Sequence, residues 1–325
     1  MSGYARASLD ARCAFPPSFF GLATGHRVVG HDEHVNLLLA AVAIVGVSAS
    51  GPLMAYAAAP ALAIGFWRNA LGSVALAPFG WRTTARELQG LDRQGQRMLI
   101  FAGAMLAVHF GTWITALQMT SVAAATAMVS MQVVFVVGID RLRGVAVRRD
   151  VLIGAALAIA GVLIITGVDF GLSARAVTGD ALALLGGLAA ALYLIAGSSL
   201  RATVSTTAYA VGCYAVCAVL LGLACLVVRD DLIGFDRSTW LAIIGVTVCA
   251  QLLGHTILNH LLAVMSPTLI SLLLLLEVPG AALLAGWFLD QRPPVGVYLG
   301  LAVILAGLAV VTLSRDRTAP EAPMA

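Results

Sequence analysis

Residues 151–168 have the sequence VLIGAALAIAGVLIITGV, and residues 297–314, which lie 146 positions later (297 − 151 = 146), have the sequence VYLGLAVILAGLAVVTLS. Six residues of the first segment recur in the second at this offset, among them Gly154 as Gly300, Gly161 as Gly307 and Thr166 as Thr312. The same offset places His109 on His255 in a chain that has only 6 histidines. The chain therefore contains two copies of one unit.

The composition of the chain is that of a membrane protein. Only 11% of its residues are charged, whereas a water-soluble domain carries about 25%, and its mean hydropathy is +0.96. An apolar run of roughly 18 or more residues is long enough to cross the hydrocarbon core as a helix. Ten such runs are predicted, at approximately 36–57, 60–80, 97–117, 120–138, 151–168, 180–200, 206–228, 239–261, 267–289 and 295–314.

Positive charge sets the predicted orientation, because cytoplasmic loops are enriched in basic residues. All 19 basic residues are arginine. With a cytoplasmic N-terminus, fourteen of them fall on the cytoplasmic side, four fall outside and Arg68 lies within a span. We therefore expect a multi-pass protein of the inner or plasma membrane with two cytoplasmic tails, residues 1–34 and 315–325.

These patterns predict an all-α integral membrane protein of ten transmembrane helices. The first unit comprises residues 35–168 and the second comprises residues 180–314. Each unit has five spans, which is an odd number, so the second unit enters the membrane upside down and the five-helix repeats are inverted. Such a duplication is typical of carriers whose substrate site lies between the two units.

Several functions are disfavoured by what the sequence lacks. The chain has no lysine, so it contains neither a nucleotide-binding P-loop nor a Schiff-base lysine. The net charge of +3 follows from the arginine-rich cytoplasmic loops, and we expect no nucleic-acid partner. The segment His31-Asp32-Glu33-His34 lacks the His-Glu-x-x-His spacing of a zinc site, and the five cysteines lack metal-ligand spacing. We therefore expect no metal and no cofactor.

The glycines of the fifth and tenth spans are seven residues apart in each unit, at Gly154/Gly161 and Gly300/Gly307. Seven residues make nearly two helical turns, so each pair clears one helix face for close contact with another helix. That contact lies either within the molecule or in a homodimer formed through span five or span ten.

Glu277 places a carboxylate near the middle of the ninth span, within Leu-Leu-Leu-Leu-Leu-Glu-Val-Pro-Gly. A charged group at that depth costs roughly 2.5–3.5 kcal/mol by insertion scales. Intramembrane ionisable groups are functional sites by default, so Glu277 is a candidate for proton coupling or for binding a substrate amine. The alternative is a protonated acid that hydrogen-bonds to a neighbouring helix.

Arg68 lies in the first half of the second span. One interpretation is that its long side chain extends to the outer surface, with Trp67 as an interfacial anchor. The other is a fixed cation that pairs with Glu277 or receives a carboxylate or phosphate group of a substrate. Its equivalent in the second unit is Tyr214 (68 + 146 = 214), so the duplication does not preserve the charge.

His109 and His255 occupy equivalent positions in spans three and eight. Because imidazole titrates near pH 6.5, the pair is a candidate for relaying protons, and the alternative is a hydrogen bond between helices. One turn further along the chain lie Trp113 and Asn259, which are also related by the repeat. The remaining candidates for a polar cavity wall are glutamines, namely Gln132 and, more weakly, Gln118 and Gln251.

Three motifs of the second unit carry a family resemblance. They are GHTILNH at residues 254–260, Glu277 followed by GAALLA at residues 280–285, and GLAVILAG at residues 300–307. Over about residues 36–314 the chain resembles the ten-span members of the drug/metabolite transporter superfamily, which are built from two EamA-type repeats. The resemblance implies a transporter that exports a small metabolite, amino acid or drug-like compound. It also implies that spans five and ten pack outside the cavity.

The sequence departs from the family pattern around the membrane carboxylate. The usual Glu-Pro pair appears here as Glu277-Val278-Pro279, and the equivalent of Glu277 in the first unit is Met131. Only the second unit therefore keeps a membrane carboxylate, and any coupling site is expected to be asymmetric.

We therefore expect a secondary active transporter, not an enzyme, that works by alternating access around a midplane cavity. Its expected partners are the lipid bilayer and a small-molecule substrate. The predicted site residues are Glu277, Arg68, His109, His255, Asn259, Trp113 and Gln132. Two alternatives from other classes stay open, an integral-membrane enzyme acting on lipid-linked substrates and a scaffold or lipid scramblase.

Overall fold

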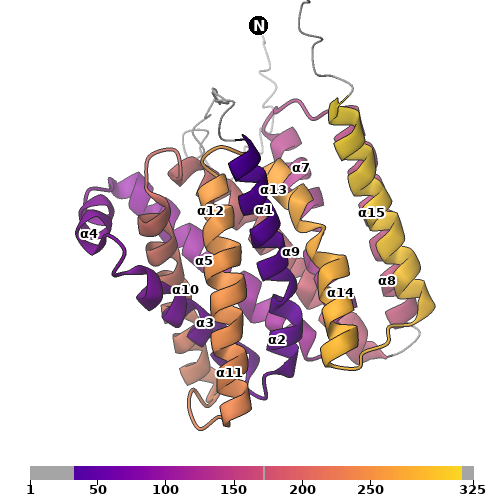
Figure 1. Ribbon diagram of the computed structural model, residues 1–325, viewed down its shortest axis with the longest axis horizontal. Helices are drawn as coiled ribbons and strands as arrows, with labels where there is room; N and C mark the ends of the chain where they lie inside the picture. The colour runs from indigo at the N-terminus through magenta and orange to yellow at the C-terminus, as the bar shows by residue number, and fades with distance from the viewer. Residues whose placement is uncertain (1–32, 171–172, 317–325) are drawn as a thin grey trace, which may run out of the picture.

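The computed structural model of the protein describes residues 33–170 and 173–316, and every regular element in these ranges is a helix (Figure 1). The helices pack side by side in one bundle. The predicted tails, residues 1–34 and 315–325, lie almost entirely outside the described residues, as does half of the His31-Asp32-Glu33-His34 segment.

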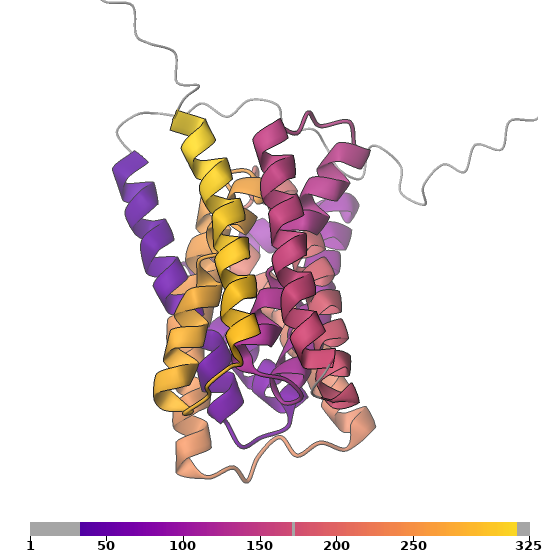
Figure 2. The same cartoon turned by 90° about the vertical axis from the view of Figure 1, so that its right-hand side faces the viewer.

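Helices occupy all ten apolar runs predicted from the sequence. The first unit contains α1 (Glu33–Ser48), α2 (Ser50–Tyr56), α3 (Ala61–Leu76), α4 (Trp81–Gln89), α5 (Arg93–Leu117), α6 (Val122–Val129), α7 (Gln132–Leu142) and α8 (Arg149–Phe170). The second unit contains α9 (Ala174–Leu200), α10 (Thr206–Val228), α11 (Arg237–Val246), the π-helix η2 (Thr247–Thr256), α12 (Ile257–Leu261), α13 (Pro267–Leu274), α14 (Glu277–Phe288) and α15 (Val295–Asp316). Among the described residues, 7 helical segments are long and apolar enough to cross a membrane. The start of α1 and the end of α15 lie at the same end of the bundle (Figure 2).

Helix α4 is an element that the sequence pattern did not predict, because it lies between the predicted spans 60–80 and 97–117. It has the polar sequence WRTTARELQ and is only 9 residues long. A search for apolar runs detects helices that lipid or other helices surround, and it misses a short helix with one polar face.

Several of the predicted spans are interrupted near their middle. Helix α6 gives way to α7 at Ser130–Met131, and α13 gives way to α14 at Leu275–Leu276, one residue before the repeat-equivalent pair (130 + 146 = 276). Helices α1 and α2 are separated at Ala49, and the eighth span passes through the π-helix Thr247–Thr256. Interrupted helices leave backbone groups unpaired, which a membrane protein tolerates where they are buried or line a cavity.

The glycines of the fifth and tenth spans face each other inside the molecule. A Cβ added at Gly161 would lie 2.5 Å from the carbonyl oxygen of Gly300, and one added at Gly307 would lie 2.6 Å from that of Gly154. Only glycine permits two helix backbones to approach so closely. Figure 2 shows α8 and α15 running antiparallel at the outside of the bundle. Both glycine faces are therefore occupied by the contact within the molecule. A homodimer through span five or ten stays a prediction and would use other faces of these helices.

Substitution of Gly161 by leucine is expected to force α8 and α15 apart, because the new side chain meets a backbone carbonyl that cannot rotate away. We expect Gly161→Leu to lower the free energy of unfolding by about 1–3 kcal/mol. Gly138→Leu in α7 is the matched control, since a Cβ there has no atom within 4 Å. Thermal unfolding of the purified variants in detergent measures both, and equal midpoints would contradict the role of the glycine contact.

Candidate functional site

A cavity lies between the two units, at the level of the helix interruptions. Its walls come from α1, α2, α5, α6 and α7 of the first unit and from α9, η2, α12, α13 and α14 of the second. Its volume is about 30 Å³, which holds about one or two water molecules. A metabolite-sized substrate therefore enters only if these helices separate.

Six of the seven predicted site residues line this cavity: Glu277, His109, His255, Asn259, Trp113 and Gln132. The seventh, Arg68, is not part of the cavity wall. The lining also includes Tyr193, Ser50 and Ser130, which the sequence pattern did not single out. Each of these three residues has an apolar residue at the equivalent position of the other unit, so a comparison of the two units does not single it out.

Three pairs of lining residues are related by the sequence repeat. They are His109 with His255, Trp113 with Asn259, and Val47 with Tyr193, each 146 positions apart (255 − 109, 259 − 113 and 193 − 47). The cavity is therefore built from equivalent positions of both units, and it lies where the two copies meet.

Glu277 supplies the carboxyl group of the described cavity wall. It is the first residue of α14, and its side chain is buried with 7% of its surface exposed. A helix N-terminus favours a negative charge. Its carboxylate has no hydrogen-bond or ion-pair partner among the described residues, although it borders the cavity. The described structure therefore does not contain the alternative arrangement, in which the Glu277 side chain hydrogen-bonds to a neighbouring helix.

Arg68 is completely buried in α3, beside the cavity, so its side chain does not extend to the outer surface. Its Nε donates to Oε1 of Gln251 at 2.8 Å and its Nη1 donates to the hydroxyl of Ser50 at 3.1 Å. The guanidinium carbon lies 4.0 Å from the centroid of the Phe110 ring. Its Nη2 has no partner in the described structure. Arg68 reaches the cavity only through Ser50, and its role toward a substrate anion stays a prediction.

A chain of polar contacts runs from Gln251 into the cavity wall. The hydroxyl of Tyr214 donates to the backbone carbonyl of Gln251 at 3.4 Å, and Nδ2 of Asn259 donates to that hydroxyl at 3.4 Å. The hydroxyl of Tyr193 donates to Oδ1 of Asn259 at 2.6 Å. Arg68 and its repeat equivalent, Tyr214, are therefore joined through the π-helix, and Tyr193 and Asn259 are held in fixed positions at the cavity.

The two histidines meet across the boundary between the units. Their ring centroids are 6.3 Å apart, and the ring of Trp113 stacks on His109 at 5.5 Å. Nδ1 of His109 lies 3.0 Å from the carbonyl oxygen of Gly186, which favours the tautomer that carries its proton on Nδ1. The indole N–H of Trp113 is buried without a partner among the described residues. The wall therefore offers a free donor near the imidazoles.

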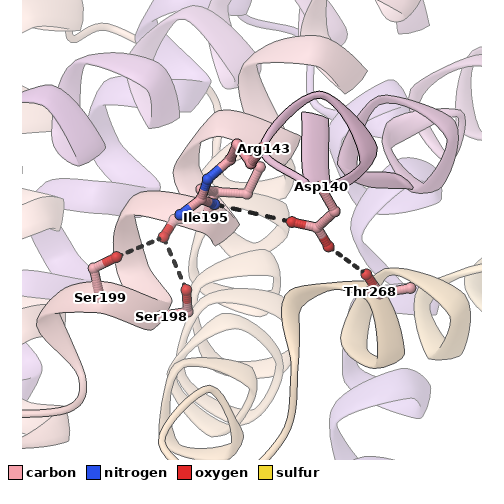
Figure 3. Close-up of polar contacts among 6 residues, drawn as sticks. All are labelled: Asp140, Arg143, Ile195, Ser198, Ser199 and Thr268. Carbon is pink, nitrogen blue, oxygen red and sulfur yellow. Dashed lines mark hydrogen bonds and ion pairs between the residues drawn. The ribbon is translucent and has the colours of Figure 1, made fainter. Parts of the chain in front are cut away.

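Two polar contacts join the units, one at each end of the fourth and ninth spans. At one end, the carboxylate of Asp140 in α7 accepts a hydrogen bond from the hydroxyl of Thr268 in α13 at 2.9 Å, and Arg143 lies 3.9 Å from the same carboxylate (Figure 3). At the other end, the backbone N–H of Val122 in α6 donates to Oε1 of Gln291 at 3.1 Å. Thr268 and Val122 are repeat equivalents (268 − 122 = 146). Their partners are not repeat equivalents (140 + 146 = 286), so the duplication relates one side of each contact.

The described residues contain no group of three or more histidine, cysteine or acidic side chains that could hold a metal ion. Four cysteines lie within this part of the chain, and all are free thiols. The chemistry that the cavity offers is therefore charge, hydrogen bonding and aromatic contact.

Comparisons with known proteins agree with this architecture. The model of the EamA-like transporter family matches residues 35–167 and 177–313, one range in each copy of the repeat. One similar solved structure, described only as "Crystal structure of protein", shares 19% sequence identity with a TM-score of 0.66. The similarity covers 87% of this chain and 98% of that one, and at this identity it shows the fold alone. No curated protein matches the sequence.

Substitution of Gln251 tests whether the polar chain stabilises the site. Gln251→Leu removes the acceptor for Arg68 and the donor for Asn69, whose carbonyl lies 3.1 Å from Nε2 of Gln251. Leaving buried polar groups unpaired costs about 1–3 kcal/mol, and more when one is charged, so we expect a clearly lower thermal midpoint. Gln89→Leu, at an exposed position, is the control. Equal midpoints for the two variants would show that the network does not stabilise the fold.

Proposed function

The chain belongs to the EamA-like transporter family, and from this premise we propose that it is a secondary active transporter that works by alternating access. In this proposal it has ten transmembrane spans in two inverted five-helix repeats, with both termini cytoplasmic. It exports a small metabolite, an amino acid or a drug-like compound across the inner or plasma membrane.

The observation that carries the proposal is the cavity built from repeat-related positions of both units. In inverted-repeat carriers the substrate site lies at the repeat interface near the bilayer midplane, flanked by discontinuous helices. Here the interruptions at Ser130–Met131 and Leu275–Leu276 lie beside the cavity wall. Helices α8 and α15 pack on each other at the outside of the bundle, which fits a supporting role for spans five and ten.

The present conformation supports an occluded state of the proposed cycle. The cavity holds about one or two water molecules, and polar contacts join the units at both ends of the fourth and ninth spans. In the proposed cycle, these two contacts close the cavity. Rocking of the units opens one end when the Asp140–Thr268 contact breaks, and the other end when the Val122–Gln291 contact breaks. Each opening then exposes Glu277 to one side of the membrane.

Glu277 is the proposed coupling or substrate-binding carboxylate. Its carboxyl group borders the cavity and has no hydrogen-bond or ion-pair partner among the described residues, so a proton or a substrate amine supplies the missing interaction. The rings of Trp113 and Tyr193 belong to the same wall and can contact an organic cation through their faces. Arg68 stays behind Ser50 and balances the charge of Glu277 when the cavity is empty.

Replacement of Glu277 by glutamine tests this role after a substrate has been identified. A panel of amino acids, polyamines, nucleotides and cationic drugs is screened first, because a true substrate raises the thermal midpoint of purified protein. A lost charge-assisted interaction is worth about 1.5–3 kcal/mol, so we expect Glu277→Gln to weaken substrate binding roughly 10- to 100-fold. Transport in proteoliposomes should fall and lose its pH dependence. Wild-type transport with unchanged pH dependence would rule out the coupling role.

Cross-linking of the two ends tests alternating access directly. In a cysteine-free background, the double substitution Asp140→Cys/Thr268→Cys should form a disulfide and hold that end of the cavity closed. A third cysteine at Ser130 in the cavity wall should then react with an impermeant maleimide from the opposite side of the membrane only. The matched pair Val122→Cys/Gln291→Cys should block the other side.

Reduction of either disulfide should restore labelling from both sides. If Ser130→Cys is unreactive from both sides before cross-linking, the protein does not alternate between open states, and a scaffold or enzyme is favoured. If labelling from both sides persists after cross-linking, the end contacts do not control access.

A further inference from the structure

Helix α4 lies at the edge of the bundle, beside α10 (Figure 1). One face of it packs on the protein. Thr84 is buried, and Leu88, one turn later, lies against α10 beside Gly212. The opposite face carries the exposed residues Arg82 and Arg86, also one turn apart. The helix therefore presents a row of cations away from the bundle.

Both acidic residues near this row are already bound to backbone groups. The carboxylate of Glu87 accepts a hydrogen bond from the backbone N–H of Ser205 at 2.8 Å, which ties α4 to the connection between α9 and α10. Burial lowers the pKa of Arg201, and the nearby Glu87 carboxylate partly opposes this shift. The carboxylate of Asp92 caps α5 and accepts from the backbone N–H of Gly95 at 2.7 Å. In the described part of the chain, neither acid forms an ion pair with an arginine of the exposed row.

The arginines of this segment are unpaired in the described structure. Arg82, Arg86, Arg93 and Arg97 are all exposed, and no acidic side chain forms an ion pair with any of them. The arginines between α7 and α8 differ in this respect, because Arg148 pairs with Asp150 at 2.9 Å and Arg143 lies 3.9 Å from Asp140. The four exposed cations of α4 and of the start of α5 therefore form a positive surface that has no ion pair among the described residues.

Two large aromatic side chains flank this positive surface. Phe79 is 73% exposed and Trp81 is 61% exposed, directly before and at the start of α4. The guanidinium carbon of Arg82 lies 5.4 Å from the Trp81 ring centroid. Exposed tryptophan next to arginine is typical of the membrane interface, where the ring enters the headgroup layer and the cation remains beside the phosphates.

We propose that α4, with Arg82, Arg86, Arg93, Arg97 and the rings of Phe79 and Trp81, is a binding surface for anionic phospholipid headgroups. The cations supply charge complementarity, and the aromatic rings fix the depth of the helix in the interface. Because Glu87 and Leu88 hold the helix in place, the surface is formed before lipid binds. A flexible basic loop would lose this preorganisation.

Quenching of Trp81 by brominated lipids tests the proposal in the full-length protein. The protein is placed in liposomes that contain either brominated phosphatidylglycerol or brominated phosphatidylcholine, and the signal of Trp81 is the difference between wild type and Trp81→Phe. We expect stronger quenching by the anionic lipid, weakened by added salt. Each basic residue near the surface contributes about fivefold, so Arg82→Gln/Arg86→Gln should lower the preference for the anionic lipid by more than tenfold.

The control variant Arg148→Gln/Arg149→Gln removes the same charge from the start of α8 and should keep the preference for the anionic lipid. Equal quenching by the two lipids, or an equal loss of preference in the control, would overturn the proposal. Displacement of the lipid by soluble glycerol phosphate would assign the surface to a free phosphate ligand and would also overturn it. If the α4 variant does not fold, the lipid and salt dependence of wild type still decides the outcome.

Discussion

The guanidinium of Arg68 is fully buried, and a charge removed from water must have its hydrogen bonds supplied by the protein. Gln251 of the second unit and Ser50 of the first supply two of them, and the face of Phe110 covers the cation. Gln251 lies in the π-helix, whose wider turn leaves its backbone carbonyl to Tyr214 and Thr256. One buried cation thus joins the two units beside the cavity, and the polar wall is arranged around it.

The duplication produced a symmetric scaffold with asymmetric chemistry. The histidine pair, the helix interruptions and the glycine contacts are present in both units. In contrast, the repeat equivalent of Glu277 is Met131, and that of Arg68 is Tyr214. A single carboxylate in a low-dielectric cavity avoids the repulsion that two would produce. The cavity therefore has walls from equivalent positions of both units, but only one carboxyl group among the described residues, that of Glu277.

The sequence was sufficient to predict the helices and most of the cavity, because lipid demands long apolar runs and because charged residues inside them are rare. Six of the seven chosen site residues line one cavity for that reason. Tyr193 was missed because an isolated tyrosine in an apolar run resembles a packing residue. The position of Arg68 behind Ser50, the π-helix and α4 were also missed. The first two depend on contacts between segments distant in the sequence, and α4 is a polar helix. Apolar runs do not reveal either kind of feature.

Two contacts between the units use the repeat equivalents Thr268 and Val122, although their partners, Asp140 and Gln291, are not repeat equivalents. Thr268 uses its side-chain hydroxyl toward a carboxylate, while Val122 uses only its backbone N–H toward a neutral amide. In a perfectly symmetric inverted repeat, the two open states would have equal free energy and equal population. A hydrogen bond to a charged group is worth about 1.5–3 kcal/mol and a neutral one about 1 kcal/mol. In the proposed cycle, this difference sets a resting preference for opening at the Val122 end, so that one side of the membrane meets the open site more often than the other.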